Sequence, residues 1–287
     1  MTAGEILVGL DGSANGAAAL RWALAEAGLR GGTVTALHAW GHTPPGHAGG
    51  GRTFDADYGA GDADAALTAA IAAAAGPEAV AAVARRVVCS PPAKALLSAA
   101  TGADLLVVGA RGVGGFRGLL LGSVSAQCLH HAIGPLAIVR SRTPDGEDSG
   151  RLVVGVDGSD SSARALGWAL AEARRRQARV DVVHAWQPPY VMPAPYTRMP
   201  LDPEVVEKDA RQLLDRLLDR EDLARQPAPV ERIAVRGTPA GAILETALGA
   251  DLVVLGSRGL GGFTGLLLGS VTHHVAHHVS CPLVVVP

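Results

Sequence analysis

The chain has 287 residues and a formal charge of −2, with 25 basic against 27 acidic residues. Hydrophobic residues make up 48% of it, which is enough for packed cores and excludes wholesale disorder. The charge balance argues against a protein that binds nucleic acid or an acidic membrane surface, because both need an excess of basic residues.

Apolar and helical patterns alternate along the first half of the chain. Short apolar runs predict strands, which are residues 5–10, 33–39, 85–89, 104–109 and 136–140. Helical spacing, with Pro92 suited to a first helical turn, predicts helices at residues 13–29, 62–75, 92–100 and 123–131. Residues 41–61 hold many Gly, Pro and His without periodicity, so a long loop is expected there. The same order returns between residues 152 and 286.

The chain carries an internal repeat that spans about half its length. ILVGLDGS at residues 6–13 returns as LVVGVDGS at 152–159. The glycine-rich stretch 109–125 returns at 256–272, with 13 of 17 residues identical. A repeat of this size far exceeds the roughly 20–50 residues of a solenoid repeat, so each copy is expected to be a domain with its own core.

Two similar domains are therefore expected, residues 1–141 and 151–287, joined by a polar linker at 142–150. Strands that alternate with helices imply a parallel sheet with right-handed crossovers. Ligands of such sheets bind beyond the carboxyl ends of the strands, at the point where the strand order reverses. Asp11 and Asp157 follow equivalent first strands and are expected at that edge.

A glycine motif follows the fourth predicted strand of each copy. Its spacing is G-x2-G-x9-G-S, and its members are Gly109, Gly112, Gly122 and Ser123, then Gly256, Gly259, Gly269 and Ser270. Glycines let the backbone approach a ligand, and a helix that starts at Gly-Ser offers free amides, a dipole and a hydroxyl to an anion. The glycines could instead be turn residues and the serine a helix cap, but two near-identical copies favour a phosphate site. A P-loop is excluded because the chain has no Gly-Lys pair.

Taken in order, these motifs resemble the universal stress protein family in its tandem form. The resemblance rests on the glycine spacing, which is that family's ATP-binding signature, on V-G-x-D-G-S, on the His-Ala strand end and on the terminal C-P-L-V-V-V. It implies an α/β fold of two doubly wound domains, each with a five-stranded parallel sheet of strand order 3-2-1-4-5. It also implies ATP, with Mg2+ or Mn2+ bound through the phosphates, and a homodimer. Family members commonly pair through the fifth strand, and because an apolar sheet edge needs a partner, the fifth strands of the two copies are expected to pair within the chain.

The resemblance also assigns ligand-lining positions residue by residue. They are the end of the first strand, the residue after the strand-two histidine, the apolar residue before the glycine motif, and the motif with the valine that follows it. In the first copy these are Gly9, Asp11, Ala39, Val108, Gly109, Gly112, Gly122, Ser123 and Val124. In the second copy they are Gly155, Asp157, Ala185, Val254, Gly256, Gly259, Gly269, Ser270 and Val271. Two ATP molecules per chain are therefore expected.

Three functions are compatible with this pattern. The first is a stress-response regulator whose ATP occupancy is read by loops, by assembly or by protein partners. The second is a slow, metal-dependent ATP hydrolase, and the third is a scaffold in which the nucleotide site is vestigial. Two preserved motifs speak against the scaffold, and the motif offers neither a lysine nor a clear base for a water molecule. The regulator is favoured, at most weak ATPase activity is expected, and no catalytic residue is assigned.

Histidines offer two further interpretations. His273 with His277, and His274 with His278, are i,i+4 pairs on the last predicted helix, a spacing that can hold a metal. Spacing alone is weak, so a solvated helix end is favoured and no protein metal site is assigned. His38 ends the second strand beside the expected ligand site, where a hydrogen-bonded core histidine is a more common role than a general base.

The cysteine count and the apolar stretches bear on the compartment. Three cysteines form no disulfide framework, and the N-terminus lacks the pattern of a signal peptide. The longest apolar stretch, residues 65–75, is too short to cross a bilayer. A soluble cytoplasmic protein is expected, with no nucleic-acid or membrane partner.

Overall fold

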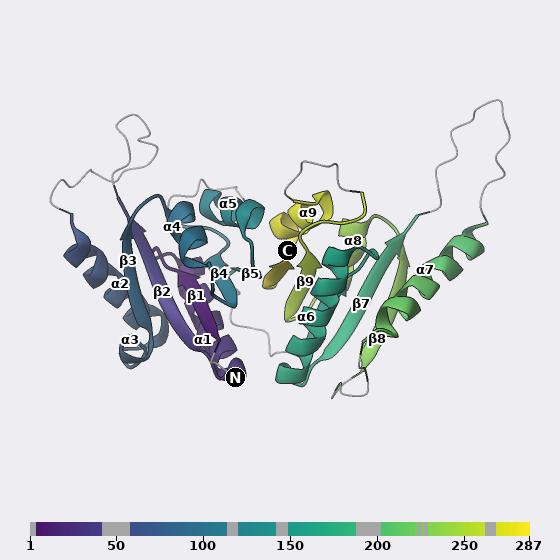
Figure 1. Cartoon of the computed structure of the whole chain (residues 1–287), viewed down its shortest axis with the longest axis horizontal. Coiled ribbons are helices and arrows are strands. Elements are labelled where there is room, and N and C mark those ends of the chain that lie inside the picture. The colour runs from purple at the N-terminus through teal and green to yellow at the C-terminus, as the bar shows by residue number, and fades with distance from the viewer. Residues whose placement is uncertain are drawn as a thin grey trace, which may run out of the picture. The chain divides into compact units, whose positions relative to one another are not determined.

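The computed structural model describes residues 4–41, 58–113, 120–141, 149–187, 202–221, 223, 226, 229–261 and 268–287. The chain divides into two compact units, Met1–Asp145 and Gly146–Pro287, called here the first and second unit. Each unit alternates strands with helices, as Figure 1 shows. Most of the loop predicted at residues 41–61 lies outside the described residues.

The first unit is built on a parallel sheet. Its described strands are β1 Glu5–Gly9, β2 Thr33–Trp40, β3 Ala84–Cys89, β4 Leu105–Gly109 and β5 Leu136–Val139. They lie in the order β3-β2-β1-β4-β5, and the neighbouring strands run parallel. Because β1 lies between β2 and β4, the strand order reverses beside it, as it does in a doubly wound fold.

The second unit repeats this sheet. Its described strands are β6 Arg151–Gly155, β7 Arg179–Trp186, β8 Val230–Arg236, β9 Leu252–Gly256 and β10 Leu283–Val286. Their order is β8-β7-β6-β9-β10, again with parallel neighbours. Counted along each unit, both orders are 3-2-1-4-5, so the predicted fold class is confirmed.

Helices cover the sheets. In the first unit they are α1 Ala14–Arg30, α2 Ala60–Ala75, α3 Ala79–Ala82, α4 Pro92–Ala99 and α5 Ser123–His131. In the second unit they are α6 Asp160–Arg176, α7 Pro203–Leu218, α8 Pro239–Thr246 and α9 Ser270–His278. α1 packs beside α2, whereas α4 packs beside α5, so each pair shares a layer. α4 begins at Pro92 as predicted, because a proline in the first helical turn gives up no intrahelical hydrogen bond.

The Asp-Gly-Ser turn between β1 and α1 explains why that helix starts where it does. Gly12 has φ +80°, a left-handed conformation that favours glycine. Ser13 then caps the helix, because its hydroxyl accepts a hydrogen bond from the amide of Gly16 at 3.0 Å. Gly158 and Ser159 repeat the turn before α6, with φ +88° at the glycine.

The cores are apolar, with buried carboxylates at the far ends of α1 and α6. Glu26 and Glu172 are fully buried. Arg30 contacts Glu26 at 2.9 Å and Arg176 contacts Glu172 at 2.7 Å, each one helical turn later. These ion pairs compensate the cost of burying a charge. Within the described part of the chain, no helix is long and apolar enough to cross a membrane.

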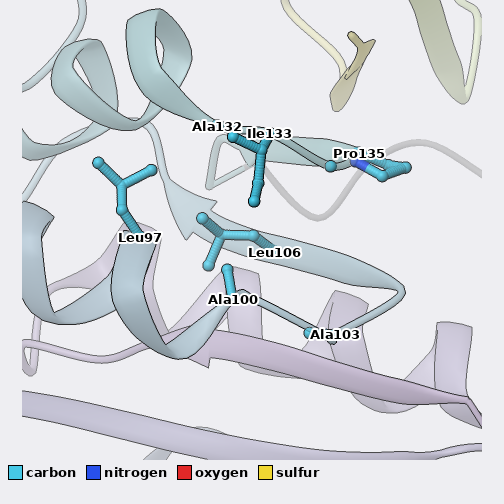
Figure 2. A pocket seen from close by; sticks show the side chains of 8 residues that line it. Leu97, Ala100, Ala103, Leu106, Ala132, Ile133 and Pro135 are labelled. Atoms are coloured by element: carbon cyan, nitrogen blue, oxygen red, sulfur yellow. The ribbon is translucent and has the colours of Figure 1, made fainter.

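Two hollows lie away from the predicted ligand site. Figure 2 shows the first, where Ile133 and Leu106 close an apolar hollow near the amino end of β4. Its free volume is about 10 Å³, which is room for one water molecule at most. The second lies between α7 and β8, holds about 460 Å³ and is lined in part by Asp215 and Arg232. Neither hollow is lined by a predicted site residue.

Candidate functional site

The carboxyl ends of β1, β2 and β4 meet at one edge of the first sheet. Gly9 on β1 is in register with Leu37 on β2, and Val8 is in register with Val107 on β4. Asp11, two residues beyond β1, therefore lies beside the glycine motif that follows β4. The ends of β6, β7 and β9 are aligned in the same way in the second unit.

Asp11 fastens the start of the glycine motif to the end of β1. Its Oδ1 accepts a hydrogen bond from the amide of Ser13, and its Oδ2 accepts one from the amide of Val113, both at 3.0 Å. The hydroxyl of Ser13 also donates to the carbonyl of Arg111 at 3.2 Å. Backbone segments about a hundred residues apart are thus held together by one carboxylate and one hydroxyl.

Asp157 does the same in the second unit and is more tightly held. Its Oδ1 accepts from both the amide of Ser159 at 3.0 Å and the Ser159 hydroxyl at 2.6 Å, and its Oδ2 accepts from the amide of Leu260 at 2.8 Å. Partial burial raises the pKa of Asp157, but these hydrogen bonds outweigh it and hold that pKa below its ordinary value. The carboxylate is therefore kept ionised beside the motif.

Two of the motif glycines in each copy are required by close packing. A Cβ on Gly109 would lie 2.6 Å from the backbone carbon of Asn15 at the start of α1. A Cβ on Gly256 would lie 2.6 Å from the hydroxyl of Ser161 at the start of α6. On Gly112 a Cβ would overlap the carboxylate of Asp11. These glycines let a helix start and a carboxylate approach the motif closely.

A backbone hydrogen bond joins the two ends of the motif just before the helix begins. The amide of Gly122 donates to the carbonyl of Ala110 at 2.8 Å, and the amide of Ala110 donates to Val139 on β5 at 2.7 Å. Gly122 is the N-cap of α5, with φ −78° and ψ 159°, so Ser123 is the first helical residue and not the cap considered from the sequence. The first-turn amides of a helix have no intrahelical acceptor, which leaves them available to an anion.

The second unit closes its motif in the same way. The amide of Gly269 donates to the carbonyl of Ser257 at 2.8 Å, and Ser257 donates its own amide to Val286 at 2.8 Å. Gly269 caps α9, and Ser270 is the first helical residue. The interiors of the two motifs, residues 114–119 and 262–267, lie outside the described residues.

Ser125 and Thr272 support the site and were not predicted. The Ser125 hydroxyl donates to the carbonyl of Gly109 at 2.6 Å, and the Thr272 hydroxyl donates to the carbonyl of Gly256 at 2.7 Å. Both side chains are buried and tie the end of the fourth strand to the helix that follows. The repeated G-S-V-[ST] was the available signal, since a hydroxyl recurs two residues after the motif serine.

His38 and His184 serve as fixed strand-end contacts. Nδ1 of His38 donates to the carbonyl of Leu10, and Nδ1 of His184 donates to the carbonyl of Val156, both at 2.8 Å. Each bond joins the end of the second strand to the residue before the aspartate. This is the hydrogen-bonded role that the sequence favoured for His38 over a general base.

The predicted site residues differ in how far they are exposed. Four are exposed: Gly112, Ser123, Gly259 and Ser270. The half-buried ones are Gly9, Asp11, Ala39, Gly109, Gly122 and Val124, with Asp157, Ala185, Gly269 and Val271 in the second unit. Gly155 and Gly256 are buried. Val108 and Val254 are 3% and 0% exposed. The two valines thus belong to the core beneath the site and offer a ligand almost no surface.

Comparison with known proteins identifies the family. The model of the universal stress protein family matches residues 3–140 and again 149–287. A universal stress protein of Mycolicibacterium smegmatis is 35% identical over 292 residues, which cover 98% of this chain and 96% of that protein. One from Mycobacterium tuberculosis H37Rv is 34% identical over 295 residues, covering 98% of this chain and 95% of the relative.

A solved structure agrees on the fold. The crystal structure of a universal stress protein from Archaeoglobus fulgidus DSM 4304 superposes with a TM-score of 0.65 and 21% sequence identity. It covers 99% of this chain, and this chain covers 96% of it. Two family matches in succession and near full-length relatives confirm the resemblance read from the motifs. The chain therefore belongs to the universal stress protein family and carries two of its domains in tandem.

Proposed function

We propose that the chain is an ATP-binding stress-response regulator with one nucleotide site in each unit. ATP occupancy changes the motif loops or the assembly of the protein, and other proteins read that state. The phosphates lie on the first turn of α5 or α9, beside Ser123 or Ser270. The adenosine end lies toward Ala39 or Ala185, at the end of the second strand.

One arrangement carries this proposal, and it occurs twice. A carboxylate, a glycine-capped helix start and an exposed serine meet at the carboxyl edge of a parallel sheet, at the point where the strand order reverses. Helix amides and the helix dipole favour negative charge, and exposed Arg111 and Arg258 stand within the two motifs. The helix amides and the arginine side chains would both bind the negative charge of a polyphosphate.

The test is the nucleotide stoichiometry of the full chain. Calorimetric titration of nucleotide-free protein with ATP is expected to saturate at two ATP molecules per chain, one for each motif. Adenosine, which lacks the phosphates, is expected to bind much more weakly. Saturation at one ATP or none would contradict the two-site proposal, and equal affinity for adenosine would contradict the placement of the phosphates.

Slow metal-dependent ATP hydrolysis is the alternative activity. Asp11 and Asp157 contact the motifs through the amides of Val113 and Leu260, but both oxygens of each carboxylate already accept backbone hydrogen bonds. A hydrolase needs a positioned nucleophile and neutralisation of the phosphate charge, and a carboxylate held in this way is a poor base. Conversion of bound ATP to ADP in a single-turnover experiment, dependent on added Mg2+ or Mn2+, would favour the slow hydrolase. A steady-state rate near the enzyme median of about 10 per second would contradict slow turnover.

Other expectations from the sequence and the family resemblance stay predictions. They are Mg2+ or Mn2+ held through the phosphates, a homodimer, a cytoplasmic location and pairing of the two fifth strands within the chain. The domain limits at 1–141 and 151–287 also stay predictions. Size measurement of the purified full chain, with and without Mg2+ and ATP, tests the homodimer and its dependence on the nucleotide.

A further inference from the structure

The last helix of the second unit, α9, carries four histidines on one short segment. Its buried residues are Thr272, Val275 and Ala276, which fix the face that packs on the sheet. His273, His274 and His278 are exposed, and His277 is half-buried. The four therefore form two pairs spaced by one helical turn, a spacing that brings side chains together.

The rings of each pair lie close enough to share one ion. The centroids of His274 and His278 are 4.5 Å apart with 34° between the ring planes, and those of His273 and His277 are 4.7 Å apart at 40°. A metal–nitrogen bond of about 2.0 Å puts each ring centre roughly 3.1 Å from the metal. Two such ligands at a right angle have ring centres about 4.4 Å apart, and at the tetrahedral angle about 5.1 Å. The observed separations of 4.5 and 4.7 Å are nearer to the right-angle value.

We propose that the His274–His278 pair, with His273–His277 beside it, binds a divalent transition-metal ion of the Cu2+ or Ni2+ kind. Imidazole is a good ligand for both ions, and ligands at right angles suit their square-planar or tetragonal geometry. Cu2+ binds most tightly of the divalent first-row series. Within the described residues no group of three or more His, Cys, Asp or Glu gathers for a metal. Since His274 and His278 are exposed, water molecules can supply further ligands.

The first unit supplies an internal control. Helix α5 ends in His130 and His131, at the positions of His277 and His278, and Gln127 stands where α9 has His274. The rings of His130 and His131 are 6.4 Å apart, because adjacent residues point in different directions around the helix. α5 therefore lacks the turn-spaced ring pair of α9 and is expected to bind such an ion only weakly.

The histidine pairs are separate from the proposed nucleotide site. Ser270 stands at the start of α9, while His274 and His278 lie four and eight residues further on, about 6 and 12 Å along the helix. A metal carried by ATP is held by hard phosphate oxygens, which favour Mg2+ or Mn2+, whereas the pairs offer nitrogen. The proposed metal site is therefore independent of ATP binding and can be tested separately.

The experiment titrates the untagged full chain with CuCl2 in the presence of excess Mg2+. Electron paramagnetic resonance of the bound Cu2+ is expected to show nitrogen ligands. The double variant His273→Ala with His274→Gln gives α9 the residues of α5 at both positions. It is expected to weaken Cu2+ binding about 100-fold, because a second ligand on the same helix no longer reinforces the first.

A gain and a control complete the test. Gln127→His places an exposed histidine one turn before His131 and is expected to add one Cu2+ equivalent per chain. His131→Ala in the parent is expected to leave Cu2+ affinity unchanged. All four substituted positions are exposed, so the thermal unfolding temperature of each variant should stay at that of the parent. Undiminished nitrogen-ligated Cu2+ in the double variant, or no added equivalent with Gln127→His, would overturn the proposal.

Discussion

Single residues at the site combine structural roles with the role proposed for them in binding. Asp11 uses both carboxylate oxygens to hold backbone amides, so it shapes the motif before any ligand arrives. Gly112 leaves room for that carboxylate. A variant at either position would therefore alter the site and the fold together. To separate an effect on binding from an effect on folding, variants must be chosen by the contacts that each new side chain would make.

Gly109→Ala is expected to destabilise the first unit. The new Cβ would lie 2.6 and 2.8 Å from backbone atoms of Asn15, which cannot move without displacing α1. Overpacking of this kind costs about 1–3 kcal/mol of unfolding free energy. Urea unfolding, with hydrogen exchange of the α1 and β4 amides as the local probe, measures the loss.

Gly134→Ala is the matched control, because a Cβ there would meet nothing within 4 Å and its backbone is not left-handed. The control should retain parental stability within about 0.5 kcal/mol. Equal stability of Gly109→Ala and Gly134→Ala would show that α1 does not press on the motif as described.

Asp157→Asn is expected to lower stability in a pH-dependent way. Hydrogen bonds from Ser159 and Leu260 lower the pKa of Asp157 in the folded chain. The stability that it contributes is therefore fully present above its ordinary pKa of about 3.9, and it is lost as the pH falls through the lower folded value. At neutral pH the variant should lose on the order of 1 kcal/mol, since the group is only partly buried.

Unfolding free energies measured between pH 2 and pH 7 test this expectation. The difference between the parent and Asp157→Asn should be constant near neutrality and shrink below about pH 4. Asp209→Asn, at an exposed position on α7, controls for the loss of one surface charge. A difference that grows on acidification would contradict the lowered pKa.

At the scale of residues, the sequence predicts side chains whose chemical type suggests ligand binding. It does not predict side chains that act through hydrogen bonds or packing within the fold. Asp11 was predicted because it recurs as Asp157 after an equivalent strand and matches a ligand-lining position of the family. Ser125 was missed because a serine inside a helix gives no local sign of bonding the carbonyl of Gly109. The core position of Val108 was hidden as well, because its burial comes from packing across the unit.

At the scale of elements, the periodic helices and the short apolar strands of the first unit were predicted well, whereas a single-turn helix was missed. α2 begins at Ala60, two residues before the prediction, because Asp62 stands at its third position and accepts a hydrogen bond from the amide of Gly59 at 2.9 Å. α3, residues Ala79–Ala82, was not predicted, because one turn is too short to show a period. Strand order could not be derived from apolar runs and came from the family resemblance.

Gly167→Ala is expected to stabilise the second unit. Gly167 lies in the interior of α6, where a Cβ would meet nothing within 4 Å. Alanine is favoured over glycine in a helix interior by about 0.8–1.0 kcal/mol, largely through the entropy of the unfolded chain. The equivalent position in α1 already holds Arg21, which donates to the carbonyl of Ala74 at 3.1 Å.

Gly158→Ala gives the opposite comparison. Gly158 has φ +88°, so alanine there is strained, and the Cβ would lie 3.2 Å from Leu213. In urea unfolding, the unfolding free energy of Gly167→Ala should be higher than that of the parent, and that of Gly158→Ala should be lower. The same sign for both would contradict the roles assigned to these two glycines.

At the scale of the whole molecule, the repeat gives the chain two copies of the proposed nucleotide site, which can be altered one at a time. Each unit has its own parallel sheet, carboxylate, glycine motif and helix start. The repeat was plain in the sequence because 13 of 17 motif residues are identical. The units differ at Asn15 and Ser161, whose side chains make different contacts beside the motif. Such differences predict two sites of unequal affinity.

Gly122→Ala combined with Ser123→Ala is expected to reduce the ATP stoichiometry from two to one. The Cβ on Gly122 would lie 3.3 Å from the Cα of Arg111, a tight contact that presses on the motif without blocking the fold. Loss of the Ser123 hydroxyl removes a hydrogen bond to phosphate, which costs about 1–3 kcal/mol when its partner stays buried. Gly269→Ala with Ser270→Ala should remove the other site in the same way. Calorimetry of both double variants and of the fourfold variant, each with a parental unfolding temperature, completes the test. If either double variant still binds two ATP molecules with parental affinity, the phosphates do not lie on that helix start.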